Sequence, residues 1–179
     1  EALKYLLEWQ RVILESASCA IIATDLQGII LTFNPAAERI LGYRAEELVG
    51  KHSPAKIHDP EEVLARARTL SAELGEEVPP GFDVFVAKTR RQLVDESEWT
   101  YICKNGSRCP VKLSVTALRS SDGSIQGYLG IARDLTREKA LEAEPASVKT
   151  ATAVPLPAPE ERPGPPTTGM TPMSLSLPA

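Results

Sequence analysis

The side chains best suited to metal chemistry in this chain are its two histidines, which lie in a segment broken by prolines. A haem iron held by a protein needs an axial ligand, commonly a histidine, on the wall of its pocket. His58, in the stretch AKIHDPEEV just before a long helical pattern, is the better candidate for that ligand, and His52 is the other. A lone histidine is more commonly a capping or solvent-facing residue than a ligand. Haem ligation by His58 is therefore one hypothesis, and the sequence predicts no other metal site.

The three cysteines, Cys19, Cys103 and Cys109, show neither a CxxC pair nor another metal-ligand spacing. They lie in or beside β-rich stretches, where a free cysteine usually packs as a small apolar residue. An odd number of cysteines does not indicate a disulfide scaffold and suits a reducing compartment. We therefore expect packing roles for all of them.

Motifs that would indicate catalysis are absent from the sequence. It has no P-loop, no HExxH pair, no GxSxG elbow and no histidine placed as the phosphoacceptor of a kinase helix. Each of these motifs brings a nucleophile, a base or a phosphate cradle to a defined position, and nothing here replaces them. The prediction is that this chain is not itself an enzyme.

Size and charge limit the remaining function classes. A chain of 179 residues that is 42% hydrophobic can bury one substantial core, which predicts a single compact domain. The net charge of -4 and the scattered lysines and arginines argue against a nucleic-acid surface. No apolar run approaches the roughly 20 residues that cross a bilayer. We expect a cytoplasmic chain without membrane contact of its own, and a parent protein with a membrane anchor is equally compatible.

The first predicted element is an amphipathic helix over residues 1–15. In EALKYLLEWQRVILE the polar residues recur at alternating spacings of three and four, and leucine and isoleucine fill the opposite side. Such a helix either covers the core of its own domain or pairs with a helix of a second copy. A homodimer through this helix is one of these two alternatives.

The predicted domain starts with a hairpin and capped helices. CAIIATDLQGIILTFN reads as two short strands around a turn that ends at Gly28. Asn34 before a proline predicts the N-cap of a short helix that ends at Gly42. Asp59 predicts the cap of a longer helix that ends at Gly75.

The second half of the domain is predicted as one helix followed by three strands. FDVFVAKTRRQ, residues 82–92, spaces Phe82, Phe85 or Val86, and Thr89 in a helical way, which favours a helix over the strand that its β-branched residues would also allow. From Glu98 onward, β-rich runs alternate with turns at Asn105-Gly106 and Asp122-Gly123, which predicts an antiparallel meander. The order of elements predicts an α+β fold in which a five-stranded antiparallel sheet carries short helices on one face. Residues 145–179 are rich in proline without periodicity, which predicts a disordered tail.

Separated motifs within residues 16–136 closely resemble a bacterial PAS sensory domain. Asn34 matches the cap of the first short helix, and Glu47-Leu48-Val49-Gly50 matches the turn before the segment that faces the ligand. Lys104 to Ser107 resembles the hairpin between the third and fourth strands. Asp134-Leu135-Thr136 resembles the family's Asp-Ile-Thr exit signal, with leucine for isoleucine and with Arg137 where glutamate is more usual.

The resemblance implies a route for the signal. In the family the last strand passes directly into an output helix, here residues 137–144, and Asp134, Leu135 and Thr136 would form the relay. Thr136 is expected to cap this helix, and Asp134 is expected to bond to the local turn. Pro145 ends the helix early.

The resemblance also implies a pocket between the sheet and the helices that holds a small ligand, a flavin, a haem or nothing. Covalent flavin chemistry of the light-oxygen-voltage type is disfavoured, because Lys51-His52-Ser53-Pro54 stands where that subclass carries its Asn-Cys-Arg motif. Lys112 and Arg133 are the cations to consider for an acidic ligand. The predicted pocket residues, each of which can equally be plain core, are Phe33, Asn34, His58, Phe82, Val86, Trp99, Tyr101, Leu113 and Val115.

The sequence therefore predicts a PAS module that detects a small ligand or a redox or gas cue and relays it through flanking helices. The expected partner is an effector domain such as a histidine kinase of a two-component system or a diguanylate cyclase. One alternative is a ligand-free module that dimerises and only transmits. A second alternative is a fragment of a histidine kinase whose whole polypeptide is a transferase.

Overall fold

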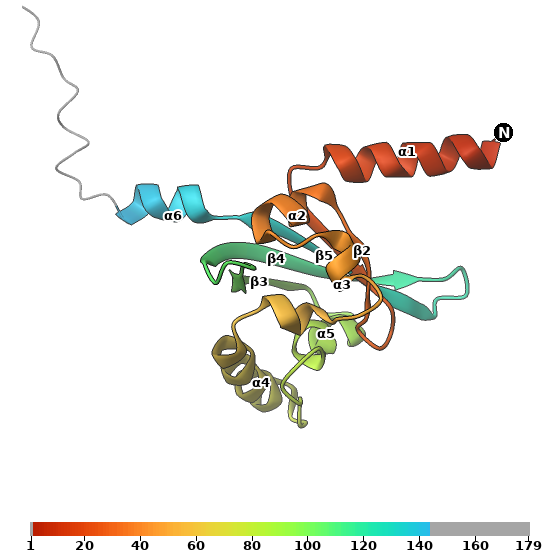
Figure 1. Ribbon diagram of the computed structural model, residues 1–179. Coiled ribbons are helices and arrows are strands. Elements are labelled where there is room, and N and C mark those ends of the chain that lie inside the picture. Colours follow the sequence, from red (N-terminus) through yellow and green to blue (C-terminus); the bar gives the residue numbers. More distant parts are fainter. Residues whose placement is uncertain (1, 144–179) are drawn as a thin grey trace, which may run out of the picture. The chain divides into compact units, whose positions relative to one another are not determined.

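The computed structural model describes residues 2–143, so the predicted tail at 145–179 lies outside the described residues. Its strands form a single antiparallel sheet in the order β2-β1-β5-β4-β3 (Figure 1). The predicted α+β fold with a five-stranded antiparallel sheet is confirmed. In chain order the elements are α1 (Ala2–Ser16), β1 (Ala20–Thr24), β2 (Ile30–Phe33), α2 (Pro35–Leu41), α3 (Ala45–Leu48), η1 (Pro54–Ile57), α4 (Pro60–Leu74), α5 (Asp83–Arg90), β3 (Asp95–Ile102), β4 (Arg108–Arg119), β5 (Ile125–Asp134) and α6 (Thr136–Ala143).

The short helices pack against the sheet and enclose the core. Helix α2 packs on β1, α3 on β2, and α5 on β3 and β4, while α4 packs against α5 (Figure 1). One continuous cluster of buried apolar side chains joins the sheet to these helices. Helices α1 and α6 contribute no buried residue and project from the domain. No helix between residues 2 and 143 combines the length and the apolar character needed to cross a membrane.

Local capping explains where the helices begin. The Asn34 side chain accepts a hydrogen bond from the Ala37 N–H, and Asp59 accepts one from the Glu61 N–H, as the sequence predicts. Gly42 and Gly75 follow the last residues of α2 and α4 in the left-handed conformation that favours glycine. Helix α5 also forms within the predicted segment, because its buried side chains pack on β3 and β4.

The central pairing of the sheet joins β1 to β5, which lie far apart in sequence. Ala20 at the start of β1 pairs with Ala132 near the end of β5, and Thr24 pairs with Tyr128. Gly127 lies so close to the Thr24 carbonyl that a Cβ atom at this position would collide with it. Because Ala20 and Ala132 are paired, the chain enters β1 and leaves β5 at the same end of this strand pair.

Asn34 joins four segments of the domain through one buried side chain, which is 2% exposed. Its Oδ1 accepts from Ile21 N at 2.8 Å and from Ala37 N at 3.0 Å. Its Nδ2 donates to Leu14 O at 3.2 Å and to Cys19 O at 3.1 Å. The end of α1, both strands of the first hairpin and the start of α2 are thus fastened at one point.

The substitution Asn34→Asp tests this junction. Aspartate keeps both acceptor bonds but loses both donor bonds and places a carboxylate against two carbonyl oxygens. We expect the free energy of unfolding to fall by about 2 kcal/mol, measured by urea denaturation. Amide exchange at the end of α1 should accelerate more than exchange in β4. A variant with unchanged stability and unchanged exchange at Leu14 would contradict this role.

The start of α6 differs from the sequence prediction. Thr136 is the first residue of the helix and does not cap it with its side chain; instead Asp134 Oδ1 accepts a hydrogen bond from Thr136 N at 2.8 Å. The local bond predicted for Asp134 is present, and it leaves Thr136 inside the helix. Leu135, 4% exposed, donates its N–H to Pro110 O at 2.8 Å. Leu135, the single residue between β5 and α6, is therefore held to β4 by a backbone hydrogen bond, so no flexible linker separates the strand from the helix.

Charged side chains tie α6 to the sheet. Lys139 Nζ lies 2.7 Å from Glu98 Oε2 on β3, and Arg133 on β5 pairs with Glu138. The hydrogen bond from Lys139 lowers the pKa of Glu98, and the same contact raises the pKa of Lys139. Side chains of the helix thus contact β3 and β5, and Leu135, the residue just before the helix, bonds to β4 through its backbone.

Candidate functional site

A small cavity lies between the sheet and the helices, where the family resemblance places a ligand pocket. Its volume is about 30 Å³. Strands β1, β3, β4 and β5 supply one wall, and η1, the residue after it, and α5 supply the other. The lining residues are Ile22, Thr24, Pro54, His58, Phe82, Phe85, Val86, Tyr101, Leu113, Val115, Tyr128 and Gly130.

Six of the nine pocket residues predicted from the sequence line this cavity: His58, Phe82, Val86, Tyr101, Leu113 and Val115. The remaining three lie elsewhere. Phe33 is a buried core residue at the end of β2, and Asn34 is the junction described above. Trp99 lies behind the cavity wall, with its ring centroid 5.3 Å from that of His58 and 5.1 Å from that of Phe85.

Sequence reasoning did not place the other six lining residues at the cavity: Ile22, Thr24, Pro54, Phe85, Tyr128 and Gly130. Thr24 and Tyr128 are opposite each other across the β1–β5 pairing, which no local pattern specifies. The helical spacing of FDVFVAKTR left open whether Phe85 or Val86 faces the sheet, and both line the cavity. The alternation of side chains along β5 could have indicated that Tyr128 and Gly130 share one face of the sheet, because every second residue of a strand points to the same side.

His58 is a deeply buried polar residue of the site, at 2% exposure. Ser53 caps η1, and His58 follows this turn and forms a β-bridge with Tyr101 on β3. Its ring packs against those of Phe85 and Tyr101, with centroids 4.2 Å and 4.8 Å away. The backbone thus holds the imidazole against the cavity rather than in solvent.

The hydrogen bonding of His58 fixes its tautomer. Nδ1 lies 2.7 Å from the carbonyl oxygen of Pro54, which can only accept, so Nδ1 carries the proton. Nε2 consequently presents a lone pair, and it has no hydrogen-bond partner. Burial lowers the pKa of His58 from 6.5 to about 4, so the ring is neutral at physiological pH.

The second unpartnered polar atom of the cavity is Thr24 Oγ1. Thr24 is 4% exposed and ends β1, where its carbonyl is closely covered by Gly127. A hydroxyl buried without a partner is uncommon in folded proteins. Thr24 and His58 therefore add one unpartnered polar atom to each wall of a mostly apolar cavity, which Tyr101 and Tyr128 also line with hydroxyl-bearing rings.

The cavity does not fit a haem or a flavin. Pockets for such groups enclose roughly 300 Å³ or more, about ten times the volume present. His58 has the unprotonated Nε2 that iron ligation requires, but Phe85 and Tyr101 pack against its ring where a porphyrin would need room. His52, the other histidine, is exposed.

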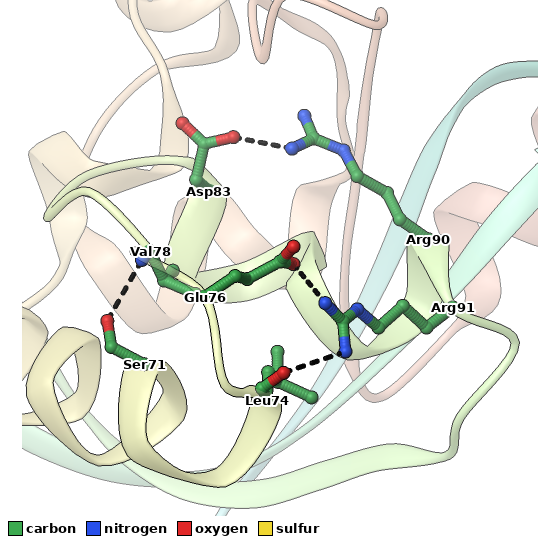
Figure 2. Close-up of polar contacts among 7 residues, drawn as sticks. All are labelled: Ser71, Leu74, Glu76, Val78, Asp83, Arg90 and Arg91. Atoms are coloured by element: carbon green, nitrogen blue, oxygen red, sulfur yellow. Dashed lines mark hydrogen bonds and ion pairs between the residues drawn. The ribbon is translucent and has the colours of Figure 1, made fainter.

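The α5 side of the cavity is held by polar contacts (Figure 2). Arg90 on α5 donates from Nε to the Tyr128 hydroxyl at 3.1 Å and pairs with Asp83 at 2.5 Å.

The segment that joins α4 to α5 is also held by hydrogen bonds. Ser71 Oγ on α4 accepts from Val78 N in this segment at 2.9 Å. Arg91 binds both Glu76 and the Leu74 carbonyl. These contacts fix the loop that positions Phe82, whose ring covers Gly28 and packs edge-on to Tyr128.

The cysteines and the two predicted cations lie outside the cavity lining. Cys103 and Cys109 are buried, and burial raises the pKa of the Cys109 thiol to about 11, which keeps it protonated. Lys112 pairs with Glu96 at 2.7 Å, and Arg133 pairs with Glu138. Lys112 and Arg133 are therefore engaged in surface ion pairs.

Residues 10–135 match a protein-family model described as the PAS fold. The C4-dicarboxylate transport sensor protein DctS of Rhodobacter capsulatus is 31% identical over 134 residues, which are 73% of this chain and 18% of that protein. The probable diguanylate cyclase DgcE of Escherichia coli (strain K12) is 25% identical over 139 residues, 78% of this chain and 11% of that protein. This chain thus spans less than a fifth of the length of these curated relatives.

A solved structure has the same fold. The crystal structure of a PAS domain from Colwellia psychrerythraea superimposes with a TM-score of 0.59 at 22% identity and covers 74% of this chain and 98% of that chain. The sheet order and the element order described above are therefore those of a known architecture.

Proposed function

The chain belongs to the PAS family, homologous to the sensory domains of histidine kinases and diguanylate cyclases, and from this premise we propose how it senses and relays. A ligand in the cavity between His58 and Thr24 would shift β5, and β5 would carry that shift into α6. The effector that receives the signal would be a histidine kinase or diguanylate cyclase domain of a longer cytoplasmic protein. Any enzymatic activity would then belong to that protein.

The observation that supports this proposal is the continuity of one strand. Tyr128 and Gly130 of β5 line the cavity, and the same strand ends at Asp134, whose carboxylate bonds to the first residue of α6. Hydrogen bonds from Thr136 lower the pKa of Asp134, although its partial burial acts in the opposite direction. Packed elements move as units, so a displacement of β5 reaches α6 without loss in a flexible linker. A ligand shifts this equilibrium only by its difference in affinity for the two arrangements.

The relay can be tested without knowing the ligand. Gly130→Ala adds a methyl group beside the cavity, 3.3 Å from Leu113 Cδ1, and so imitates an occupant. We expect amide exchange within α6 to change several-fold, measured by hydrogen-exchange NMR, because the altered wall displaces β5.

The matched control is Gln126→Ala, which alters an exposed residue on the same strand outside the cavity lining. It should leave exchange in α6 unchanged. If Gly130→Ala alters exchange around the cavity but leaves residues 136–143 at the rates of the control, the relay through β5 is wrong.

A second candidate function, transmission by dimerisation alone, is favoured by the exposed face of α1. Leu6 is 62% exposed and Ile13 is 58% exposed, although both belong to the apolar side of the helix. Because α1 buries no residue on its own domain, we propose that two copies pair through this face. Sedimentation at several concentrations should then show a dimer, and Leu6→Glu with Ile13→Glu should convert it to a monomer. A strict monomer at all concentrations would exclude this pairing.

The name of one relative does not indicate the ligand of this cavity. The name of the Rhodobacter capsulatus protein refers to C4-dicarboxylate transport, and a dicarboxylate needs cations around its charges. The lining of this cavity contains no lysine or arginine. We therefore propose a different ligand class for this chain.

A further inference from the structure

Two buried polar atoms without partners face one cavity, and they constrain what can bind there. Among the buried side-chain nitrogen and oxygen atoms of residues 2–143, Thr24 Oγ1 and His58 Nε2 are those without a hydrogen-bond partner. Both residues line the same cavity, from opposite walls. Native proteins satisfy nearly all such atoms, so a partner from outside the chain is expected.

The tautomer of His58 determines the kind of hydrogen bond that the ligand must make. Since Nδ1 donates to the Pro54 carbonyl, Nε2 can only accept. The ligand must therefore present an N–H or O–H group to His58. The Thr24 hydroxyl can donate or accept, so it is compatible with either an oxygen or a second donor on the ligand.

The cavity lining also determines the charge of the ligand. None of its side chains carries a charge at neutral pH, and most are apolar or aromatic. A carboxylate or an ammonium ion would lose its hydration here without gaining an opposite charge, which is strongly unfavourable. The ligand is therefore uncharged.

The volume sets the size of the ligand. About 30 Å³ holds roughly two to three water-sized groups. The edge-on packing of Phe82 on Tyr128 and the hydrogen bond from Arg90 to the Tyr128 hydroxyl join the α5 wall to β5.

From these constraints we propose that the cavity binds a small uncharged molecule with an N–H or O–H group, such as a primary amide or a short alcohol, between His58 Nε2 and Thr24 Oγ1. This inference rests on the proposed sensory function and names the ligand class for that same site. Recognition comes from two hydrogen bonds inside an apolar enclosure, which rejects ions and molecules without a donor group.

The test uses formamide and acetonitrile as probes of the full chain. Both have the same number of non-hydrogen atoms, but only formamide has a donor group. We follow the ¹⁵N shift of His58 Nε2 and the amide shifts of Thr24 and Gly130 by NMR. Formamide should give saturable shifts with a Kd that is no tighter than the order of 1 mM for so few atoms. Acetonitrile should bind at least about tenfold more weakly, as expected for the loss of one buried hydrogen bond.

Three variants distinguish this site from nonspecific effects. Thr24→Val removes the hydroxyl at nearly constant shape and should weaken formamide binding about tenfold, whereas Thr24→Ser should retain it. Thr89→Val is the matched control, because Thr89 is also buried but already bonds to Val115 O and does not line the cavity. It should leave the affinity for formamide unchanged.

The possible outcomes test the proposed ligand class and the proposed relay through β5 separately. Equal binding of acetonitrile, or shifts that do not saturate, would overturn the ligand class, and so would a long-lived water at His58 that formamide does not displace. Saturable binding of formamide with no response in residues 136–143 would leave the ligand class standing and would overturn the proposed relay. Saturable binding with a response in α6 is the result we expect.

Discussion

Replacing Trp99 with alanine is expected to lower the free energy of unfolding by about 4 kcal/mol. Trp99 is 5% exposed and packs against the rings of His58 and Phe85, with the Arg66 guanidinium 5.4 Å from its ring centroid. Truncation leaves a large void under the histidine of the cavity. For a domain of this size, the melting temperature should fall by about 10 to 15 °C, measured by calorimetry with and without formamide.

The chain provides its own matched control for this substitution. Trp9, the only other tryptophan, lies on α1 and is 51% exposed. Trp9→Ala should change the unfolding free energy of a monomeric sample by less than about 0.5 kcal/mol. If Trp99→Ala melted at the temperature of the unmodified protein, the placement of Trp99 in the core would be contradicted.

Acidification from pH 7 to pH 4 is expected to remove about 3 kcal/mol of stability through His58 alone. Burial lowers the pKa of His58 from 6.5 to about 4, so the unfolded chain binds a proton near pH 6.5 and the folded domain only near pH 4. Between these values the unfolded state holds more protons, and stability therefore rises with pH. The contribution is complete above pH 6.5 and is lost progressively as the pH falls towards 4.

The variant His58→Phe isolates this contribution. Urea denaturation at a series of pH values between 6.5 and 4.5 should show that stability rises with pH more steeply in the unmodified protein than in the variant. Burial raises the pKa of the Asp95 carboxyl, which contributes a slope of opposite sign equally to both proteins. The carboxyl groups of Glu98 and Asp134 have lowered pKa values, so their losses fall mainly below this range. Equal slopes for the two proteins would show that His58 does not titrate as a buried, neutral residue.

The sequence predicted those features of the fold that depend on neighbouring residues. Asn34 and Asp59 could be identified as caps because a cap acts on an N–H two or three residues away. Turns such as Asn105-Gly106 could be identified for the same reason, since Gly106 adopts the left-handed conformation that the turn requires.

Features that depend on distant pairing could be predicted only in part. His58 was placed at the cavity as the candidate haem ligand that the family resemblance suggested, and Tyr101 was placed there by strand alternation within the same family fold. Thr24 was not, because its position opposite Tyr128 follows from the pairing of the first strand with the last. Trp99 points to the same face of β3 as Tyr101, but it packs against the rings of His58 and Phe85 and does not line the cavity, which strand alternation cannot show.

The junction of β1 with β5 has a consequence for how such a domain can be combined with others. Ala20 and Ala132 are paired neighbours, so the polypeptide arrives and departs at almost the same place. A domain with adjacent points of arrival and departure can be inserted between two helices, duplicated or deleted as a cassette with little change in the separation of the flanking segments. Modular recombination of this kind needs no new interface, because Asn34 on one side and Asp134 on the other carry the attachments within the domain itself.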